Sequence, residues 1–164
     1  MKVRKFSIQI EEFDSPGQLN PDDQVLLKAA HHAVKSSYAP YSAFHTGSSA
    51  LLDNGEIISG SNQENAAYPS GLCAERVTLF QAKSRFPESA VHSLAITAHA
   101  EHFDIDHPIT PCGACRQVIA EVQNRQEEKI RIIMQGEKGS VYIADGIENL
   151  LPLMFKEDNL KRSK

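Results

Sequence analysis

The string Pro111-Cys112-Gly113-Ala114-Cys115 carries the most information about fold and chemistry in this sequence. It opens a segment, 112–124, whose apolar residues recur at helical spacing. Two thiols three positions apart in the first turn of a helix lie on one face, so both can reach one metal ion. The helix N-terminus supplies free N–H groups and partial positive charge, which lower thiol pKa values. By itself, a Cys-x-x-Cys pair is also compatible with a redox pair and with half of a structural zinc site.

Cys73 provides a third thiol, at the start of a second predicted helix that runs to about residue 83. Three protein ligands leave one position of a tetrahedral zinc site open for water, which distinguishes a catalytic site from a closed structural one. Cys73-x-Glu75 together with the 111–115 string resembles the three-cysteine variant of the zinc deaminase signature. Alternatively, Cys73 is a small buried hydrophobe, but the charged pair Glu75-Arg76 that follows favours a functional position.

Cys73 and Glu75 also set a geometric condition. Residues two apart on a regular helix point ~200° away from each other. Both can therefore face one zinc-bound water only if Cys73 lies in extended chain at the mouth of its helix. Pro69-Ser70-Gly71, directly before Cys73, is compatible with such a mouth.

Length and composition exclude several classes of protein. The chain has 164 residues, enough for one domain, and no apolar run long enough to span a membrane. Its formal net charge of −4 argues against binding a polynucleotide. No signal-peptide pattern follows the basic start, so we expect the cytoplasm, where the three cysteines stay reduced.

Strand patterns alternate with helix patterns along the chain, which predicts an α/β layered domain. The expected helices are 20–37, 73–83, 112–124 and a Pro-interrupted 147–155, and the expected strands are 6–10, 48–52, 56–59, 91–97, 130–134 and 140–143. Asp53-Asn54-Gly55 is a hairpin signal, and the polar segment 99–110 is expected to be a loop. We expect a single domain over 1–164, with 1–20 as a possible N-terminal extension.

Further motifs resemble the nucleoside cytidine deaminase family, in particular its short, tetrameric, three-cysteine branch. In chain order they are Tyr41-Ser42-Ala43-Phe44, Asn62-Gln63-Glu64-Asn65-Ala66-Ala67-Tyr68, Cys73-Ala74-Glu75-Arg76, Pro111-Cys112-Gly113-Ala114-Cys115-Arg116-Gln117, and Leu150-Leu151-Pro152 with Phe155. The resemblance covers about 29–155. The first two dozen residues and the loop 99–110 lie outside the pattern, Thr46-Gly47-Ser48-Ser49 is more polar than the family's usual strand, and Gln63 replaces a usual Val.

The resemblance implies a three-layer α-β-α fold with a central mixed sheet of about five strands, and a homotetramer with shared active sites. It implies zinc-dependent hydrolytic deamination of cytidine and 2′-deoxycytidine to uridine and 2′-deoxyuridine plus ammonia, in pyrimidine salvage. One Zn²⁺ per chain would be held by Cys73, Cys112 and Cys115. Its water, with a pKa lowered toward ~7, would attack C4 of cytosine while Glu75 moves protons to ring N3 and to the leaving amine.

The same resemblance assigns further residues. Three thiolates and Zn²⁺ sum to a charge of −1, which Arg76 would offset by hydrogen bonding to sulfur; alternatively, Arg76 makes a surface salt bridge. The substrate-binding residues would be Phe44 against the pyrimidine, Asn62 and Glu64 on the ribose 3′-hydroxyl, Ala74, and, completing a neighbouring subunit's site, Ala66, Tyr68 and Phe155. A polar turn at 62–64 and plain core packing of the three aromatic residues are the alternatives, and Arg116 and Gln117 are interpreted as ordinary helix residues.

Competing hypotheses remain open at this point. His99-Ala100-Glu101 matches the His-x-Glu form of the same signature, but it lies too close to Cys112 for a helix and a strand between them. We therefore expect a solvated loop containing His99, His102 and His107. The substrate could instead be another base, a nucleotide or an aminonucleoside, and a catalytically silent zinc-stabilised module is a further alternative.

Overall fold

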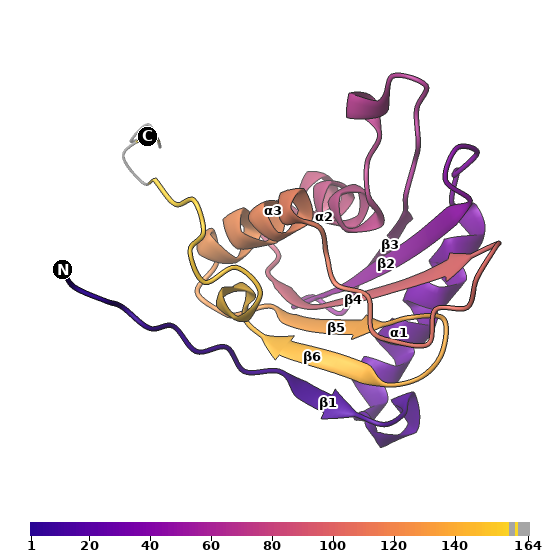
Figure 1. Cartoon of the computed structure of the whole chain (residues 1–164). Coiled ribbons are helices and arrows are strands. Elements are labelled where there is room, and N and C mark those ends of the chain that lie inside the picture. The colour runs from indigo at the N-terminus through magenta and orange to yellow at the C-terminus, as the bar shows by residue number, and fades with distance from the viewer. Residues whose placement is uncertain (158–159, 161–164) are drawn as a thin grey trace.

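The computed structural model describes residues 1–157 and 160. Its centre is a mixed six-stranded sheet in the order β1-β6-β5-β4-β2-β3, in which β4 and β5 are parallel and the other neighbours are antiparallel (Figure 1). The strands are β1 (Glu11–Phe13), β2 (Phe44–Leu52), β3 (Ile57–Ser61), β4 (Val91–Ala100), β5 (Arg131–Gln135) and β6 (Val141–Asp145). The predicted α/β class and mixed sheet are confirmed, with β1 as an additional edge strand.

Helices cover both faces of this sheet, which gives the predicted three layers (Figure 1). On one face, α1 (Pro21–Ala33) packs Leu26 and Leu27 against β4, β5 and β6. On the other face, α2 (Ala74–Arg85) and α3 (Gly113–Asn124) enclose the larger core with Leu79 and Ile119. Short 3-10 turns complete the chain at η1 (Pro16–Gln18), η2 (Val34–Ser36), η3 (Tyr68–Ser70) and η4 (Ile147–Asn149).

Local sequence signals explain where these elements begin and how closely they pack. Asn20 caps α1, because its Oδ1 accepts a hydrogen bond from the Asp23 N–H at 2.8 Å. Gly47 lets α1 approach β2, since a Cβ at this position would lie 2.2 Å from the Ala30 carbonyl oxygen. Gly60 does the same for α2 on the opposite face, where a Cβ would lie 2.8 Å from Thr78 Oγ1. The two glycines therefore set the spacing of the layers.

The N-terminal strand begins further along the sequence than predicted. The alternation at 6–10 predicted a strand there, but β1 forms at Glu11–Phe13 against β6. Within the described residues no strand pairs with 6–10, and Phe6 and Ile8 are 57% and 56% exposed. The pattern has the right period, yet a strand also needs a neighbouring edge to bond to.

Two further predictions of element bounds are wrong. Only the turn η4 forms where a helix over 147–155 was expected, because Pro152 has no N–H to donate and its ring would collide with the Glu148 carbonyl in a helix. β4 extends to Ala100 because β2 begins at Phe44 and the two residues pair. His99 therefore lies on a strand rather than in a loop.

Among the described residues, no helix is long and apolar enough to cross a membrane.

Candidate metal centre and active site

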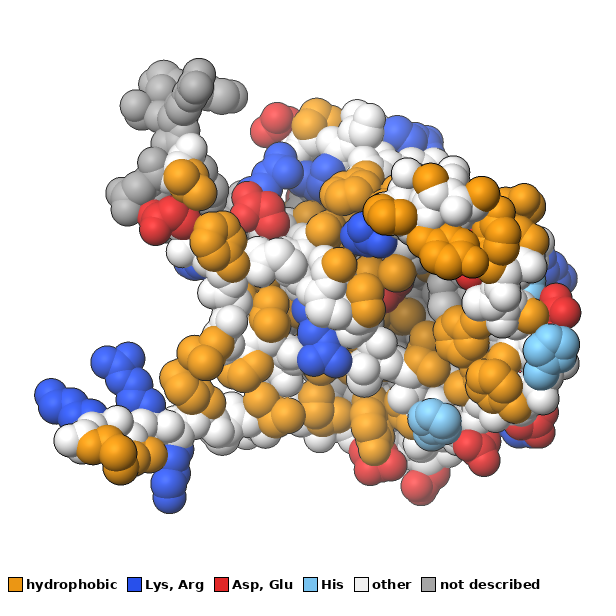
Figure 2. Space-filling view, turned by 45° about the horizontal axis from the view of Figure 1, so that its top comes forward, with side chains coloured by type: hydrophobic (Ala, Val, Ile, Leu, Met, Phe, Trp, Pro, Cys, Tyr) orange, Lys and Arg blue, Asp and Glu red, His pale blue; other side chains and the backbone are white. Residues whose placement is uncertain are grey.

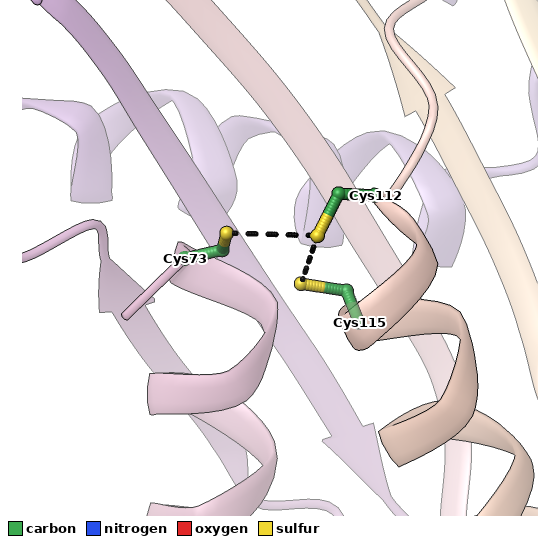
Figure 3. A group of neighbouring side chains, drawn as sticks. All are labelled: Cys73, Cys112 and Cys115. Atoms are coloured by element: carbon green, nitrogen blue, oxygen red, sulfur yellow. Dashed lines mark hydrogen bonds between the residues drawn. The ribbon is translucent and has the colours of Figure 1, made fainter. Parts of the chain in front are cut away.

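The three cysteines form one cluster between α2 and α3 (Figure 3). The sulfur of Cys73 lies 3.8 Å from that of Cys112, and the sulfurs of Cys112 and Cys115 lie 3.4 Å apart. All three sulfurs are within 4.8 Å of one another, and none of these cysteines forms a disulfide. The three-cysteine cluster that the sequence motifs and their resemblance to the zinc deaminase signature predicted is therefore present.

Helix termini bring the sulfurs together. Cys73 is the N-cap of α2 and Cys112 is the N-cap of α3, both with extended backbone, at ψ angles of 156° and 167°. Cys115 lies one turn into α3 and is fully buried. Because Cys73 precedes the first helical turn, the condition set by its spacing to Glu75 is met. The positive ends of two helices also converge on the sulfurs, which favours thiolates.

The cluster fits a tetrahedral zinc ion. Zn–S bonds of ~2.3 Å at tetrahedral angles place sulfur atoms ~3.8 Å apart, close to the two separations found here. Three sulfur donors are a zinc ligand set that leaves a fourth position for water or substrate. No other group of three or more potential ligands gathers in the described part of the chain.

Arg76 contributes positive charge beside the sulfurs. Its Nη2 lies 3.9 Å from the Cys73 sulfur and 3.3 Å from the Gly71 carbonyl oxygen, to which it donates. Its Nε is buried and has no partner among the described residues, so it retains a donor for a charged neighbour. A hydrogen bond from the Cys115 thiol and the contact with Arg76 lower the pKa of Cys73 to about 5. The hydrogen bond that Cys115 makes to Cys73, together with burial, raises the pKa of Cys115.

Glu75 is the buried carboxyl group of the site. It follows Cys73 in the first turn of α2 and is 5% exposed. Burial, reinforced by the negative charge of Cys73, raises its pKa above that of an ordinary glutamate, and the Cys115 thiol lies close enough to interact with it. A carboxyl group with a raised pKa in a cavity can both accept and donate a proton near neutral pH.

A cavity of about 950 Å³ opens beside the cluster. Seven of the predicted site residues line it: Phe44, Asn62, Glu64, Tyr68, Cys73, Glu75 and Cys112. Figure 2 shows the hollowed, largely apolar face of the molecule. Cys115 belongs to the cluster and Arg76 contacts it, but neither lines the cavity. The cavity wall also lacks Ala74, which is fully buried, Ala66, which is exposed, and Phe155, which is 68% exposed.

Asn62 and Glu64 are both held by the surrounding chain. The Asn62 Oδ1 accepts hydrogen bonds from the Thr46 N–H at 2.8 Å and from the Ser37 hydroxyl at 2.5 Å, and its Nδ2 donates to the Phe44 carbonyl at 2.9 Å. Glu64 accepts from the Ser42 hydroxyl at 2.6 Å and from the Tyr41 N–H at 2.9 Å. These bonds, led by the one from Ser42, lower the Glu64 pKa. The segment therefore presents both side chains in fixed orientations.

Aromatic rings form part of the cavity wall. Phe44 stacks on Phe103 of the loop after β4, with ring centroids 6.4 Å apart, and Tyr68 meets Tyr41 edge-on at 5.6 Å. Tyr68 is nevertheless 74% exposed. Phe44 is therefore partly packed, as its core alternative implied, and still faces the cavity.

Some contributions were missed at the sequence level. Residues 107–110 of the loop after β4 line the cavity, although this loop lay outside the family pattern. Arg116 donates to the carbonyls of Pro111 and Leu150, each at 2.8 Å, and Gln117 exchanges hydrogen bonds with the Phe155 backbone. These two residues are more than ordinary helix positions, because they tie the C-terminal segment to the turn that carries Cys112.

The alternative His-x-Glu motif, His99-Ala100-Glu101, does not join the cysteine cluster. His99 pairs with Glu137 at 3.1 Å, and Glu101 pairs with His45 at 3.0 Å. His107 is exposed as expected, but it also borders the cavity. The thiols therefore remain the metal centre that the described residues support.

Comparison with known proteins agrees with this geometry. Residues 20–128 match the family model described as the cytidine and deoxycytidylate deaminase zinc-binding region. The chain is 36% identical over 139 residues to cytidine deaminase of Halalkalibacterium halodurans, an alignment that covers 85% of this chain and 98% of the relative. It is also 36% identical over 139 residues to cytidine deaminase of Sporosarcina psychrophila, covering 85% and 95% respectively.

Solved structures show the same likeness. A crystal structure of cytidine deaminase from Burkholderia pseudomallei matches with a TM-score of 0.69 and 32% identity, over 80% of this chain and 97% of that one. The structure of cytidine deaminase from Mycobacterium tuberculosis matches with a TM-score of 0.64 and 28% identity, over 84% and 100%. The likeness therefore extends over nearly the whole of both relatives.

Proposed function

The chain belongs to the zinc-binding cytidine and deoxycytidylate deaminase family, and we propose from this premise which of its residues carry out the reaction. It is a hydrolytic cytidine deaminase that uses one Zn²⁺ per chain. The observation that supports the residue assignment best is the buried carboxyl group of Glu75 beside three clustered sulfurs.

Cys73, Cys112 and Cys115 would hold the zinc ion as thiolates. When bound there, Zn²⁺ lowers the pKa of a coordinated water toward ~7 and so supplies a nucleophile at neutral pH. Arg76 would stabilise the negative charge of the thiolates through its contact with the Cys73 sulfur. Such supporting contacts typically change metal affinity or activity by ~10–100-fold.

Glu75 would transfer the protons of the reaction. It takes one proton from the attacking water and delivers it to ring N3 as the C4–O bond forms. It then transfers the second proton of the same water to the 4-amino group, and the C4–N bond breaks to release ammonia. Cytidine and water are thereby converted into uridine and ammonia, and the raised pKa of Glu75 suits a group that must act in both directions.

Asn62, Glu64 and Phe44 would bind the nucleoside. The amide and the carboxylate both line the cavity, where they can contact one sugar hydroxyl, and the Phe44 ring can pack on the pyrimidine. The Glu64 carboxylate, whose pKa is lowered, disfavours a phosphorylated substrate. We therefore propose cytidine and 2′-deoxycytidine as substrates, and pyrimidine salvage in the cytoplasm as the context.

The assembly we propose is a homotetramer with shared active sites. Tyr68 and Phe155 are large aromatic side chains that are 74% and 68% exposed in the single chain. Exposed aromatic residues are typical of surfaces that a partner covers, and Tyr68 also lines the cavity. Ala66 lies on the same exposed segment as Tyr68, and Ala74 supports the start of α2 beneath the site.

A direct assay tests this function. Purified protein with its metal content measured should convert cytidine to uridine, followed by the loss of cytidine absorbance and by ammonia release. A strong chelator should abolish turnover, and added Zn²⁺ should restore it. Rates on cytosine and on cytidine monophosphate should be far lower; a zinc-loaded protein that prefers either of them, or turns over none of the three, would contradict the proposal.

A further inference from the structure

A line of polar side chains runs behind the nucleoside cavity, from the far face of the sheet to Asn62. Gly47 of β2 faces α1, because a Cβ there would meet the Ala30 carbonyl and Val34. His45, two residues earlier on the same strand, faces the same side, whereas Phe44 and Thr46 line the cavity. His45 can therefore reach the cavity only through other residues.

Ser37 makes that connection. The Asn62 Oδ1 accepts from the Thr46 N–H, which identifies this atom as the amide oxygen. The Ser37 hydroxyl must therefore donate its single proton to Asn62, at 2.5 Å. The Nδ1 of His45 lies 3.1 Å from the same hydroxyl oxygen, so the ring nitrogen has to be the donor in this contact.

The second ring nitrogen of His45 faces a carboxylate. Nε2 lies 3.0 Å from Glu101 Oε1, so the form of the ring that satisfies both contacts carries a proton on each nitrogen. His99 stacks on the ring at 6.3 Å, and after the hydrogen bonds from Ser42 and Tyr41 the charge of His45 also lowers the pKa of Glu64. His45 is thus fixed by Glu101 on one side and fixes Ser37 on the other.

This arrangement determines which atom Asn62 offers to a ligand. Its oxygen has two lone pairs, both of them occupied by Thr46 and Ser37, and one Nδ2 proton is bound to the Phe44 carbonyl. The fourth bonding position of the side chain, the second Nδ2 proton, has no partner among the described residues. Asn62 therefore presents an N–H donor, while Glu64 beside it presents an acceptor, which together match one sugar hydroxyl.

We propose that His45 and Ser37 are positioning residues that hold the Asn62 amide with its N–H toward the sugar of the nucleoside. The proposal rests on the proposed function, in which Asn62 and Glu64 bind the ribose 3′-hydroxyl. Without Ser37 or His45 the amide keeps only its contacts with the Thr46 N–H and the Phe44 carbonyl, so it is held less firmly and its remaining N–H is directed less precisely at the sugar. Recognition of the 3′-hydroxyl weakens, and the proton transfers at Glu75 do not change.

Two substrates that differ only at the 3′ position test this role. For wild type, Ser37→Ala, His45→Ala and the double variant, kcat/KM is measured on cytidine and on 3′-deoxycytidine. Each single variant should lower the preference for cytidine about fivefold, the effect of one net hydrogen bond, mainly through KM. The double variant should lose no more than either single one, because both residues act in one chain of contacts.

The exposed His92 of β4 provides a matched control, since His92→Ala removes a histidine without touching Asn62. Zinc content and melting temperature are recorded for every variant, and His45→Asn replaces His45→Ala if the alanine variant does not fold. An unchanged substrate preference in folded, zinc-loaded variants would overturn the inference. Absence of cytidine turnover in the wild type would instead overturn the proposed function.

Discussion

Replacing Glu75 by glutamine is the most informative single change in this protein. The amide keeps the size of the side chain and its place in the first turn of α2, so the sulfur cluster and the cavity wall should be retained. It removes the one property that the reaction needs, the ability to accept a proton and release it again. Zinc content and assembly should therefore be unaffected while turnover is lost.

The structure indicates how large the loss should be. General acid–base catalysis contributes ~10²–10⁴-fold to rates, and the upper part of this range applies where no other group can substitute. Glu75 is 5% exposed, so bulk water cannot replace it. Among the described residues that line the cavity, the other carboxylate is Glu64, which is already bound to Ser42 and Tyr41. We expect kcat on cytidine to fall by about 10³–10⁴-fold.

The assay is steady-state deamination of cytidine, with zinc measured on the same samples. Glu121→Gln, on the exposed side of α3, is the matched control and should keep wild-type kcat. A Glu75→Gln protein that retains zinc and turns over cytidine within tenfold of wild type would refute the assignment of Glu75 as the proton carrier. Loss of zinc from this variant would refute the claim that the carboxyl group is separate from the metal ligands.

Three further predictions follow from the same site. Arg76→Gln should weaken zinc retention against a competing chelator by ~10–100-fold, whereas unchanged retention would leave Arg76 without its assigned role. In the metal-free chain, burial raises the pKa of Glu75, so ionising this buried group destabilises the folded state once the pH rises past the ordinary carboxyl pKa of ~4.3. Glu75→Gln should therefore raise the melting temperature at pH 7 and leave it unchanged below pH ~4.3. Mixing inactive Glu75→Gln chains with Phe155→Ala chains should restore activity in mixed assemblies if neighbouring subunits share sites, and no recovery on subunit exchange would argue against sharing.

The parts of the site that follow from local spacing were predictable from the sequence. Cys112 and Cys115 flank the first turn of α3, and Cys73 lies directly before the turn of α2 that carries Glu75, so their placement depends on little beyond the geometry of a helix start. The orientation of Asn62 was not predictable, because it depends on Ser37 and Thr46, which come from different elements. Such contacts are set by which loops meet in space, and a one-dimensional pattern does not contain that information.

The same distinction applies to the fold. The internal helices and strands have strong periodicity and caps, as at Asn20, and formed near their predicted positions. Apart from the longer β4, the errors lie at the ends of the chain, at 6–10 and 147–155, where a pattern of the right period lacks a neighbouring strand or contains Pro152. The sequence also did not predict that residues 107–110 line the cavity, since the path of a loop is set by what it packs against.

X-ray absorption at the zinc edge, recorded on the wild-type protein as purified, tests the central claim most directly. Coordination by the three cysteines predicts three sulfur neighbours at ~2.3 Å and one lighter neighbour, oxygen or nitrogen, at ~2.0 Å. Four sulfur neighbours, or a shell of nitrogen and oxygen without sulfur, would contradict an open catalytic site built from Cys73, Cys112 and Cys115.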